Sequence, residues 1–253
     1  MNNYSVFIIH NCEILRIKFR FANLDYFQKG GEFMIESQAW DWSKNESDHW
    51  LIPAIESCYL AELWKSKGFK KFLDLGCGLG RHSIYFAQKG YEVNSIDLSD
   101  YAVNHLRNWA EKEQLHITTG VCDMLNLPFA NDTFDCLIAY NVIYHTDTQG
   151  FIKSLEEIKR VLKSNGELFI TLLSKDTWSY QRADQYKRID SNTILRDEHD
   201  TERNVPHFYV DIEDIKKYFI EFDFINIPVE QTEYNMKNTK HFSKHFNLIV
   251  RKK

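Results

Sequence analysis

A chain of 253 residues with 43% hydrophobic and 26% charged residues suits one globular domain with an elaboration, and it requires no second domain. Its net charge of −5, with no Lys/Arg cluster interleaved with aromatic residues, argues against nucleic acid as a partner. The five cysteines are odd in number and widely spaced, which favours free thiols over disulfides. The apolar run at residues 6–9 is too short for a membrane span, so we expect a soluble cytoplasmic protein.

Residues 1–33 form an N-terminal extension that precedes the expected first helix. Apolar and basic side chains alternate over residues 15–21, as in a strand with one basic face. The segment Lys29-Gly30-Gly31-Glu32 can be encoded as AAA-GGA-GGT-GAA, a bacterial ribosome-binding sequence, just before the codon for Met34. We therefore hypothesise that Met34 is the natural start, that residues 1–33 are a poorly packed translated leader, and that residues 34–253 are the domain.

An aromatic segment follows Met34 and leads into a predicted helix. Trp40, Trp42 and Trp50 are predicted either to cap a ligand cleft or to pack on the surface. The helix has one apolar face, which we expect to pack against the domain and which carries Ile52, Ile55, Tyr59 and Leu63.

A strand, a glycine turn and a helix start then follow one another directly. The apolar residues at 72–75 fit a short buried parallel strand, which Gly76, Gly78 and Gly80 end. Glycines let the backbone turn sharply and approach a ligand, and the free N–H groups of the following helix, residues 81–88, face that ligand. A dinucleotide fingerprint would need its third glycine at position 81, which is Arg81, so the turn argues against a nicotinamide cofactor.

Acidic residues follow the next two predicted strands. The second strand, residues 91–96, ends on Asp97, whose carboxylate can accept hydrogen bonds from both hydroxyls of a ribose. A helix N-cap is the alternative role for Asp97, but Ser99 is available as the cap. The third strand, residues 116–122, ends on Asp123. The fourth, residues 134–140, delivers residues 141–145 at its carboxyl end, where ligands bind in open α/β sheets.

The C-terminal half continues the alternation of helices and strands. We predict an amphipathic helix over residues 151–162, a strand over 167–173, a helix from Asp211 to Phe219, and two strands over 222–229 and 242–251. Residues 174–210 are too long for a plain connection and are rich in aromatic and charged side chains. Their place after the fifth strand suggests a substrate lid, with a solvated excursion as the alternative.

The segment Asp74-Leu75-Gly76-Cys77-Gly78-Leu79-Gly80 resembles the first motif of the class I S-adenosylmethionine-dependent methyltransferases, of the small-molecule type. This resemblance implies an α/β fold, a Rossmann-like doubly wound sheet of seven mainly parallel strands with an antiparallel last strand and helices on both faces. It also implies S-adenosyl-L-methionine as cofactor, no metal, and an acid at Asp123 on the adenine amino group. The cofactor-binding residues implied are Asp74, Gly76, Cys77, Gly78, Gly80, Arg81, Asp97, Leu98, Asp123, Met124, Tyr140 and Asn141.

The expected reaction moves a methyl group to an O, N or S atom of a small-molecule acceptor. The candidate bases are His145, then Tyr144 and His207, although His145 could equally serve the structure or the adenosine side. The fourth strand lacks the motifs of enzymes that methylate nucleic-acid bases, which favours a small-molecule acceptor, and we expect a monomer or homodimer. The alternatives are a non-catalytic module that binds the cofactor or a partner and, less favoured, a nicotinamide-dependent oxidoreductase.

Overall fold

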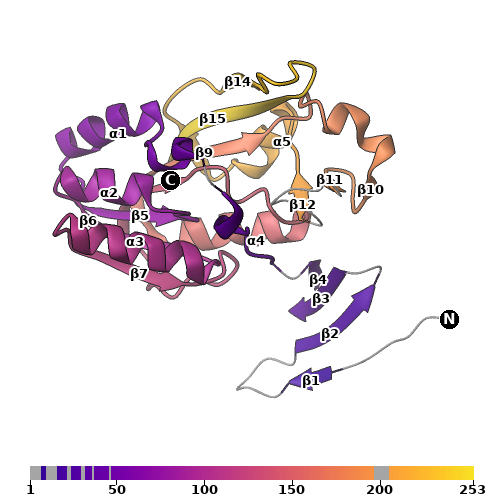
Figure 1. Cartoon of the computed structure of the whole chain (residues 1–253), viewed down its shortest axis with the longest axis horizontal. Coiled ribbons are helices and arrows are strands. Elements are labelled where there is room, and N and C mark those ends of the chain that lie inside the picture. The colour runs from indigo at the N-terminus through magenta and orange to yellow at the C-terminus, as the bar shows by residue number, and fades with distance from the viewer. Residues whose placement is uncertain are drawn as a thin grey trace.

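The computed structural model describes residues 7–9, 16–21, 24–29, 32–35, 37–45, 47–196 and 205–253. Its main body is an eight-stranded sheet in the order β13-β15-β9-β8-β5-β6-β7, with β14 paired to β15 (Figure 1). The strands are β5 (Lys71–Leu75), β6 (Glu92–Asp97), β7 (Ile117–Val121), β8 (Phe134–Ala139), β9 (Leu162–Leu173), β13 (Phe222–Phe224), β14 (Val229–Tyr234) and β15 (Phe242–Lys252).

The central strands run parallel, and the C-terminal strands do not. Strands β5 to β9 pair in parallel, whereas β15 is antiparallel to β9, β13 and β14. The predicted mainly parallel sheet is therefore confirmed. The predicted strand over 222–229 is instead two strands, because β13 and β14 pair with successive parts of β15. Because β13 and β14 share the position beside β15, the eight strands occupy seven positions in the sheet.

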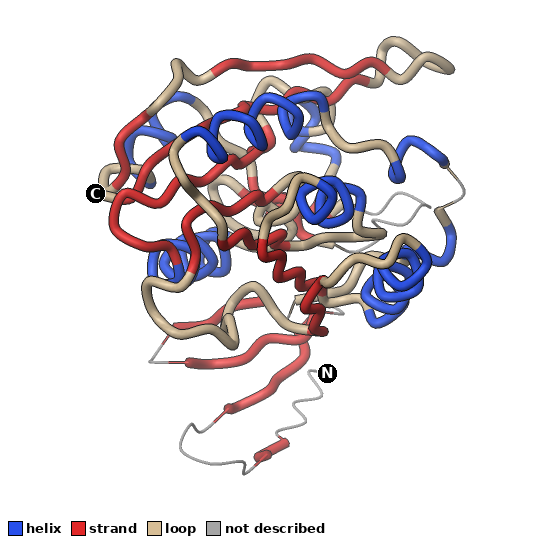
Figure 2. The backbone as a smooth tube through the Cα atoms, turned by 90° about the vertical axis from the view of Figure 1, so that its left-hand side faces the viewer, coloured by secondary structure: helices blue, strands red, loops and turns tan. Residues whose placement is uncertain are grey.

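Helices cover both faces of this sheet (Figures 1 and 2). Helices α1 (Ile55–Ser66), α2 (Arg81–Gln88) and α3 (Asp100–Lys112) pack into clusters on one face, and α4 (Thr148–Val161) and α5 (Ile212–Tyr218) into the cluster on the other. Strand β5 has a continuous buried run because it is covered on both faces. Helix α5 follows Asp211, as the predicted start of this helix required, and Asp211 and Asp214 form a reciprocal capping box there.

The buried face of α1 differs from the predicted one. Ile55 and Tyr59 are 82% and 61% exposed, while Leu60 and Trp64 are fully buried. Both pairs follow helical spacing, so periodicity alone cannot choose between them. The indole of Trp64 decides the choice, since it donates to the buried carboxylate of Glu167 over 2.9 Å.

The N-terminal strands form a separate antiparallel sheet. It contains β1 (Phe7–Ile9), β2 (Arg16–Phe21), β3 (Leu24–Lys29) and β4 (Glu32–Ile35) in sequence order. The strand expected around residues 15–21 is thus present as β2. In Figure 1 this sheet extends away from the main body, with β4 next to α4 and β1 farthest from it. The hypothesis that translation starts at Met34, which lies within β4, stays a prediction.

The described parts of the insertion, residues 174–196 and 205–210, pack against the main body. They contain the short helix η3 (Tyr180–Gln185) and a three-stranded sheet of β10 (Lys187–Arg188), β11 (Thr193–Leu195) and β12 (Pro206–Phe208). Phe208 stacks on Phe151 of α4 at 4.2 Å between ring centroids, and both side chains are buried. Phe208 and Tyr209 of the insertion are therefore part of the core, whereas Trp178, Tyr180 and Tyr186 are half-buried.

Candidate functional site

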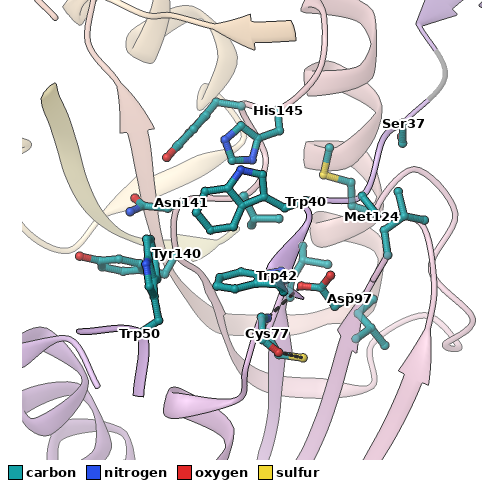
Figure 3. A pocket seen from close by; sticks show the side chains of 18 of the residues that line it. Ser37, Trp40, Trp42, Trp50, Cys77, Asp97, Met124, Tyr140, Asn141 and His145 are labelled. Carbon is teal, nitrogen blue, oxygen red and sulfur yellow. Dashed lines mark hydrogen bonds between the residues drawn. The ribbon is translucent and has the colours of Figure 1, made fainter. Parts of the chain in front are cut away.

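A cavity of about 280 Å³ opens at the carboxyl ends of β5, β6, β7 and β8 (Figure 3). Its lining comes from the glycine turn after β5, the ends of β6 and β7, the loop after β8, strands β12, β14 and β15, and the segment that precedes α1. Clefts at this edge of an open α/β sheet are where ligands bind in this class of fold.

Backbone, rather than side chains, forms the floor of the cavity at the glycine turn. Gly76 and Gly78 have φ values of +68° and +52°, in the left-handed region that glycine tolerates. A Cβ on Gly76 would lie 2.2 Å from Cγ2 of Val142, and one on Gly78 would lie 2.6 Å from Cζ2 of Trp42. Both positions therefore require glycine for conformation and for space.

Two predicted cofactor residues lie behind this floor and not among the lining residues. Gly80 has a φ of +99°, and a Cβ there would lie 2.4 Å from Leu106 Cδ1, so this glycine lets α2 pack against α3. Asp74 is buried and accepts a 2.5 Å hydrogen bond from Ser83 Oγ at the start of α2. Burial raises the pKa of Asp74 to about 6. Asp74 and Gly80 thus support the turn from beneath.

Asp97 lines the cavity at the end of β6. Its Oδ2 accepts a hydrogen bond from the Gly78 N–H at 2.9 Å, and its Oδ1 accepts one from the Ser99 N–H at 2.8 Å. Burial raises its pKa, while these two hydrogen bonds act in the opposite direction. Ser99 caps α3 as expected, through its contact with the Ala102 N–H. The remaining lone pairs of the Asp97 carboxylate can therefore serve a ligand.

Asp123 and its neighbours lie after the adjacent strand, β7. Asp123 Oδ1 accepts hydrogen bonds from the Leu125 N–H at 2.9 Å and from the Ser37 hydroxyl at 3.1 Å. Leu98, Cys122 and Met124 also line this part of the cavity. The structure thus brings both predicted acids to one cavity.

The loop after β8 presents Tyr140 and Asn141. Asn141 has a φ of +56°, a conformation that asparagine tolerates better than most residues. Its N–H donates to Thr171 Oγ1 at 2.7 Å, and its Oδ1 accepts from the same hydroxyl at 2.8 Å. These two bonds fix the backbone at the carboxyl end of β8.

Arg81, predicted to bind the cofactor, lines the cavity and holds a neighbouring segment. Its Nη1 donates to the carbonyl oxygens of His49 and Ile52, and its guanidinium lies 5.0 Å from the ring centroids of both Trp50 and Tyr140. Burial lowers its pKa. We call the segment that it holds the aromatic arm, defined as residues 37–45 and 47–54.

Three tryptophans of the aromatic arm extend into the cavity (Figure 3). Trp40, Trp42 and Trp50 meet edge to face, with ring centroids 4.6 to 5.4 Å apart. This geometry is the favourable one for aromatic pairs. Of the two predicted roles for these residues, lining the cleft is therefore the one observed.

All three predicted candidate bases lie together at one end of the cavity. The rings of His145 and His207 are 5.0 Å apart, and those of Tyr144 and His145 are 4.6 Å apart, between centroids. His207 Nδ1 lies 2.8 Å from the Val205 carbonyl oxygen, and this hydrogen bond requires a proton on Nδ1. The Tyr144 hydroxyl lies 3.4 Å from Nε2 of His245.

Sequence reasoning missed His245, Glu233 and Ser37, which also line the cavity. His245 pairs with Leu173 at the end of β9, and Glu233 lies on β14. Finding His245 and Glu233 would have required the register of the antiparallel strands, which the sequence pattern does not give. Burial raises the pKa of Glu233, whereas the charges of His49 and Arg81 lower it.

The residues at the floor of the cavity fit an adenosyl cofactor. Gly76 and Gly78 bring bare backbone to the cavity lining, and the acids Asp97 and Asp123 follow neighbouring strands. Among the described residues, no group of three or more His, Cys, Asp or Glu side chains is arranged to hold a metal ion. In the same part of the chain, every helix is too short or too polar to cross a lipid bilayer.

Comparisons with known proteins point to one family. Residues 72–166 match the model of a methyltransferase domain family. A probable S-adenosyl-L-methionine-dependent methyltransferase, TehB of Haemophilus influenzae, is 32% identical over 109 residues, which are 42% of this chain and 37% of TehB. A ubiquinone biosynthesis O-methyltransferase of Coxiella burnetii is 29% identical over 131 residues, 51% of this chain and 54% of the relative. The matches thus span about half or less of these relatives.

Solved structures share the fold over a larger part of the chain. A SAM-dependent methyltransferase of Methanosarcina mazei has a TM-score of 0.63 at 18% identity, covering 73% of this chain and 92% of that one. A Burkholderia thailandensis 1,6-didemethyltoxoflavin N1-methyltransferase has a TM-score of 0.54 at 18% identity, covering 78% of each chain. With its glycine turn, its paired acids and its matched segment, this chain is similar to the class I methyltransferases, whose methyl donor is S-adenosyl-L-methionine.

Proposed function

We propose that this protein transfers the methyl group of S-adenosyl-L-methionine to an O, N or S atom of a small-molecule acceptor. The observation that carries the proposal is the shared cavity. The glycine turn, Asp97 and Asp123 face the same space as the histidine and tyrosine side chains at its other end. A donor and an acceptor held in one enclosed space meet the main requirement of methyl transfer, which is alignment away from water.

The cofactor half follows from the floor of the cavity. The Gly76–Gly78 backbone would hold the amino-acid part of the cofactor, the Asp97 carboxylate would accept the ribose hydroxyls, and Asp123 would contact the adenine. When bound, the cofactor supplies a methyl group already activated by its sulfonium. The protein itself has no covalent step to perform, so its residues bind, orient and exclude water.

The acceptor half follows from the side chains at the other end. Imidazole in general exchanges protons near neutral pH and is suited to take a proton from a hydroxyl, thiol or ammonium group. We assign this role first to His145, whose ring extends into the cavity in Figure 3, with His207 packed edge to face against it. Tyr144 is the remaining candidate.

The charge of the lining favours a hydroxyl acceptor. Three carboxylates line the cavity among the described residues. Asp97 and Asp123 belong to the cofactor half, and the positively charged neighbours that act on Glu233 are His49 and Arg81. An ammonium acceptor beside the histidines would thus lack a carboxylate of its own, whereas a hydroxyl could pass its proton to an imidazole. The O-methyltransferase among the relatives is consistent with this choice.

A screen of fractionated metabolite extract for S-adenosylhomocysteine release tests the proposal. We expect release with at least one fraction, and we expect His145→Gln to lower kcat by about 10² to 10⁴ while cofactor affinity is kept. Asp97→Ala is the matched variant in the other half and should weaken the cofactor instead.

Three outcomes would contradict parts of this proposal. Binding of S-adenosyl-L-methionine without release in any fraction would indicate a non-catalytic binding module. Tighter binding of NAD than of S-adenosyl-L-methionine would favour an oxidoreductase. Unchanged kcat in the His145, His207 and Tyr144 variants would remove the base from the mechanism.

A further inference from the structure

The aromatic arm touches the two residues at opposite ends of the cofactor half. The hydroxyl of Ser37 donates to Asp123 Oδ1, at 3.1 Å, beyond the end of β7. The indole of Trp42 lies against Gly78, so close that a Cβ on that glycine would come within 2.6 Å of it. The arm therefore reaches from one strand end to another across the floor of the cavity.

The C-terminal end of the arm is firmly attached. Arg81 donates to the carbonyl oxygens of His49 and Ile52 and lies against the ring of Trp50. His82 Nε2 accepts a hydrogen bond from the Ala54 N–H at 3.2 Å, and burial lowers the pKa of His82 to about 3, which keeps it neutral as an acceptor. Residues 49–54 are thus bonded to the first turn of α2.

The N-terminal end of the arm is held mainly by ring packing, because Trp40 and Trp42 lie edge to face against Trp50. Within the described residues, the hydrogen bonds of residues 38–45 stay inside the arm, as in the exposed contacts of Asp41 with Ser43 and Lys44. The indole Nε1 of Trp40 is buried and has no hydrogen-bond partner there. The Ser37–Asp123 bond is the one hydrogen bond between residues 37–45 and the described main body. Segments with few such bonds are the ones that open locally.

We propose that the aromatic arm is a gate, in which Ser37 and Trp42 occupy Asp123 and Gly78 until S-adenosyl-L-methionine displaces them. The inference rests on the proposed function, because that function assigns the adenine to Asp123 and the amino-acid part of the cofactor to Gly78. The cofactor and the closed arm then compete for the same surfaces. The apparent affinity for the cofactor is reduced by the fraction of molecules whose arm is open.

Whether a mutation in the arm strengthens or weakens cofactor binding tells a gate from a fixed part of the binding site. If Trp42 competes with the cofactor, its removal strengthens binding. If Trp42 instead packs on the bound cofactor, its removal weakens binding, since contact area is lost. The same reasoning holds for Ser37, whose removal frees an oxygen of Asp123.

Calorimetric titration with S-adenosylhomocysteine measures this direction without turnover. We expect Trp42→Ala to bind about tenfold more tightly than the wild type, the gain available when an arm closed in about nine molecules of ten is removed. Ser37→Ala should shift the Kd in the same direction by less. Trp178→Ala is the control, because Trp178 lies outside the cavity lining, against His241, and should leave the Kd unchanged.

Stopped-flow tryptophan fluorescence of the wild type gives a second readout. The observed rate should level off as S-adenosylhomocysteine rises, because arm opening limits it, and Ser37→Ala should raise that limit. Equal or weaker binding in both arm variants would overturn the gate while leaving the proposed function intact. Absence of binding in the wild type and in every variant would contradict the proposed function and the gate with it.

Discussion

The floor of the cavity and the wall opposite to it are built in different ways. The floor comes from residues 76–79, Arg81 and the ends of two neighbouring strands, which carry the carboxylates of Asp97 and Asp123. The opposite wall is assembled from the aromatic arm, the loop after β8 and residues on β12, β14 and β15. The floor is one contiguous stretch with two strand ends, so its sequence and conformation can vary little. The opposite wall combines side chains from several segments, so its chemistry can vary and its parts can move. This difference suits a shared cofactor and a variable acceptor.

The largest effect should come from filling the floor. Gly78→Val places a branched side chain at a φ of +52° in the space next to Trp42, and we expect binding of S-adenosylhomocysteine to fall about a hundredfold or more. Gly90→Val is the matched control, because Gly90 has a φ of +87° with nothing within 4 Å of a Cβ. The control should lose stability through backbone strain but keep its affinity. Equal affinities of Gly78→Val and Gly90→Val for S-adenosylhomocysteine would contradict the assignment of the floor to the cofactor.

The support beneath the floor should show a pH dependence. The pKa of Asp74 is about 6 in the folded protein against 3.8 as its ordinary value, so the folded state holds the proton more tightly. Stability attributable to this group is therefore lost as pH rises from about 4 to 6, by about 3 kcal/mol. Asp74→Asn cannot titrate, so its free energy of unfolding relative to the wild type should rise by that amount across this range. Parallel pH profiles in urea unfolding would contradict the burial of an ionisable carboxyl here.

The smallest effect is expected on the assembled wall. Tyr144→Phe removes a hydroxyl that lies 3.4 Å from His245 Nε2 in the acceptor half. We expect the Kd for S-adenosylhomocysteine to stay within about twofold of the wild type, a change below 0.5 kcal/mol. A tenfold loss of affinity for S-adenosylhomocysteine, measured by calorimetry, would show that the acceptor half also holds the cofactor. The floor and the opposite wall would then not have separate roles.

The location of several floor residues could be predicted from local sequence, while their role toward the cofactor stays a proposal. Gly76, Gly78 and Asp97 could be found because a strand, a turn and a helix start are short-range features, and parallel crossovers bring successive strand ends together. The positions of Asp74 and Gly80 behind the floor were not predictable. The same residue types serve contact and support, and only packing against Ser83 and Leu106 separates these roles.

The assembled wall was only partly predictable. His145 followed from its place after the fourth predicted strand, but His245 required the register of β15 against β9. On α1, two stripes of apolar residues fit the helical period equally well. Contact of Trp64 with Glu167 buried the stripe that sequence reasoning did not choose. Where tertiary packing decides between equal local patterns, a single sequence is insufficient.

A crystal structure of the protein with S-adenosylhomocysteine tests the central claim most directly. We predict the ribose hydroxyls on the Asp97 carboxylate, the adenine beside Asp123 and the homocysteine part along the Gly76–Gly78 backbone. Electron density for the ligand outside this cavity, or a cavity without ligand at saturating concentration, would contradict the assignment of the floor to the cofactor.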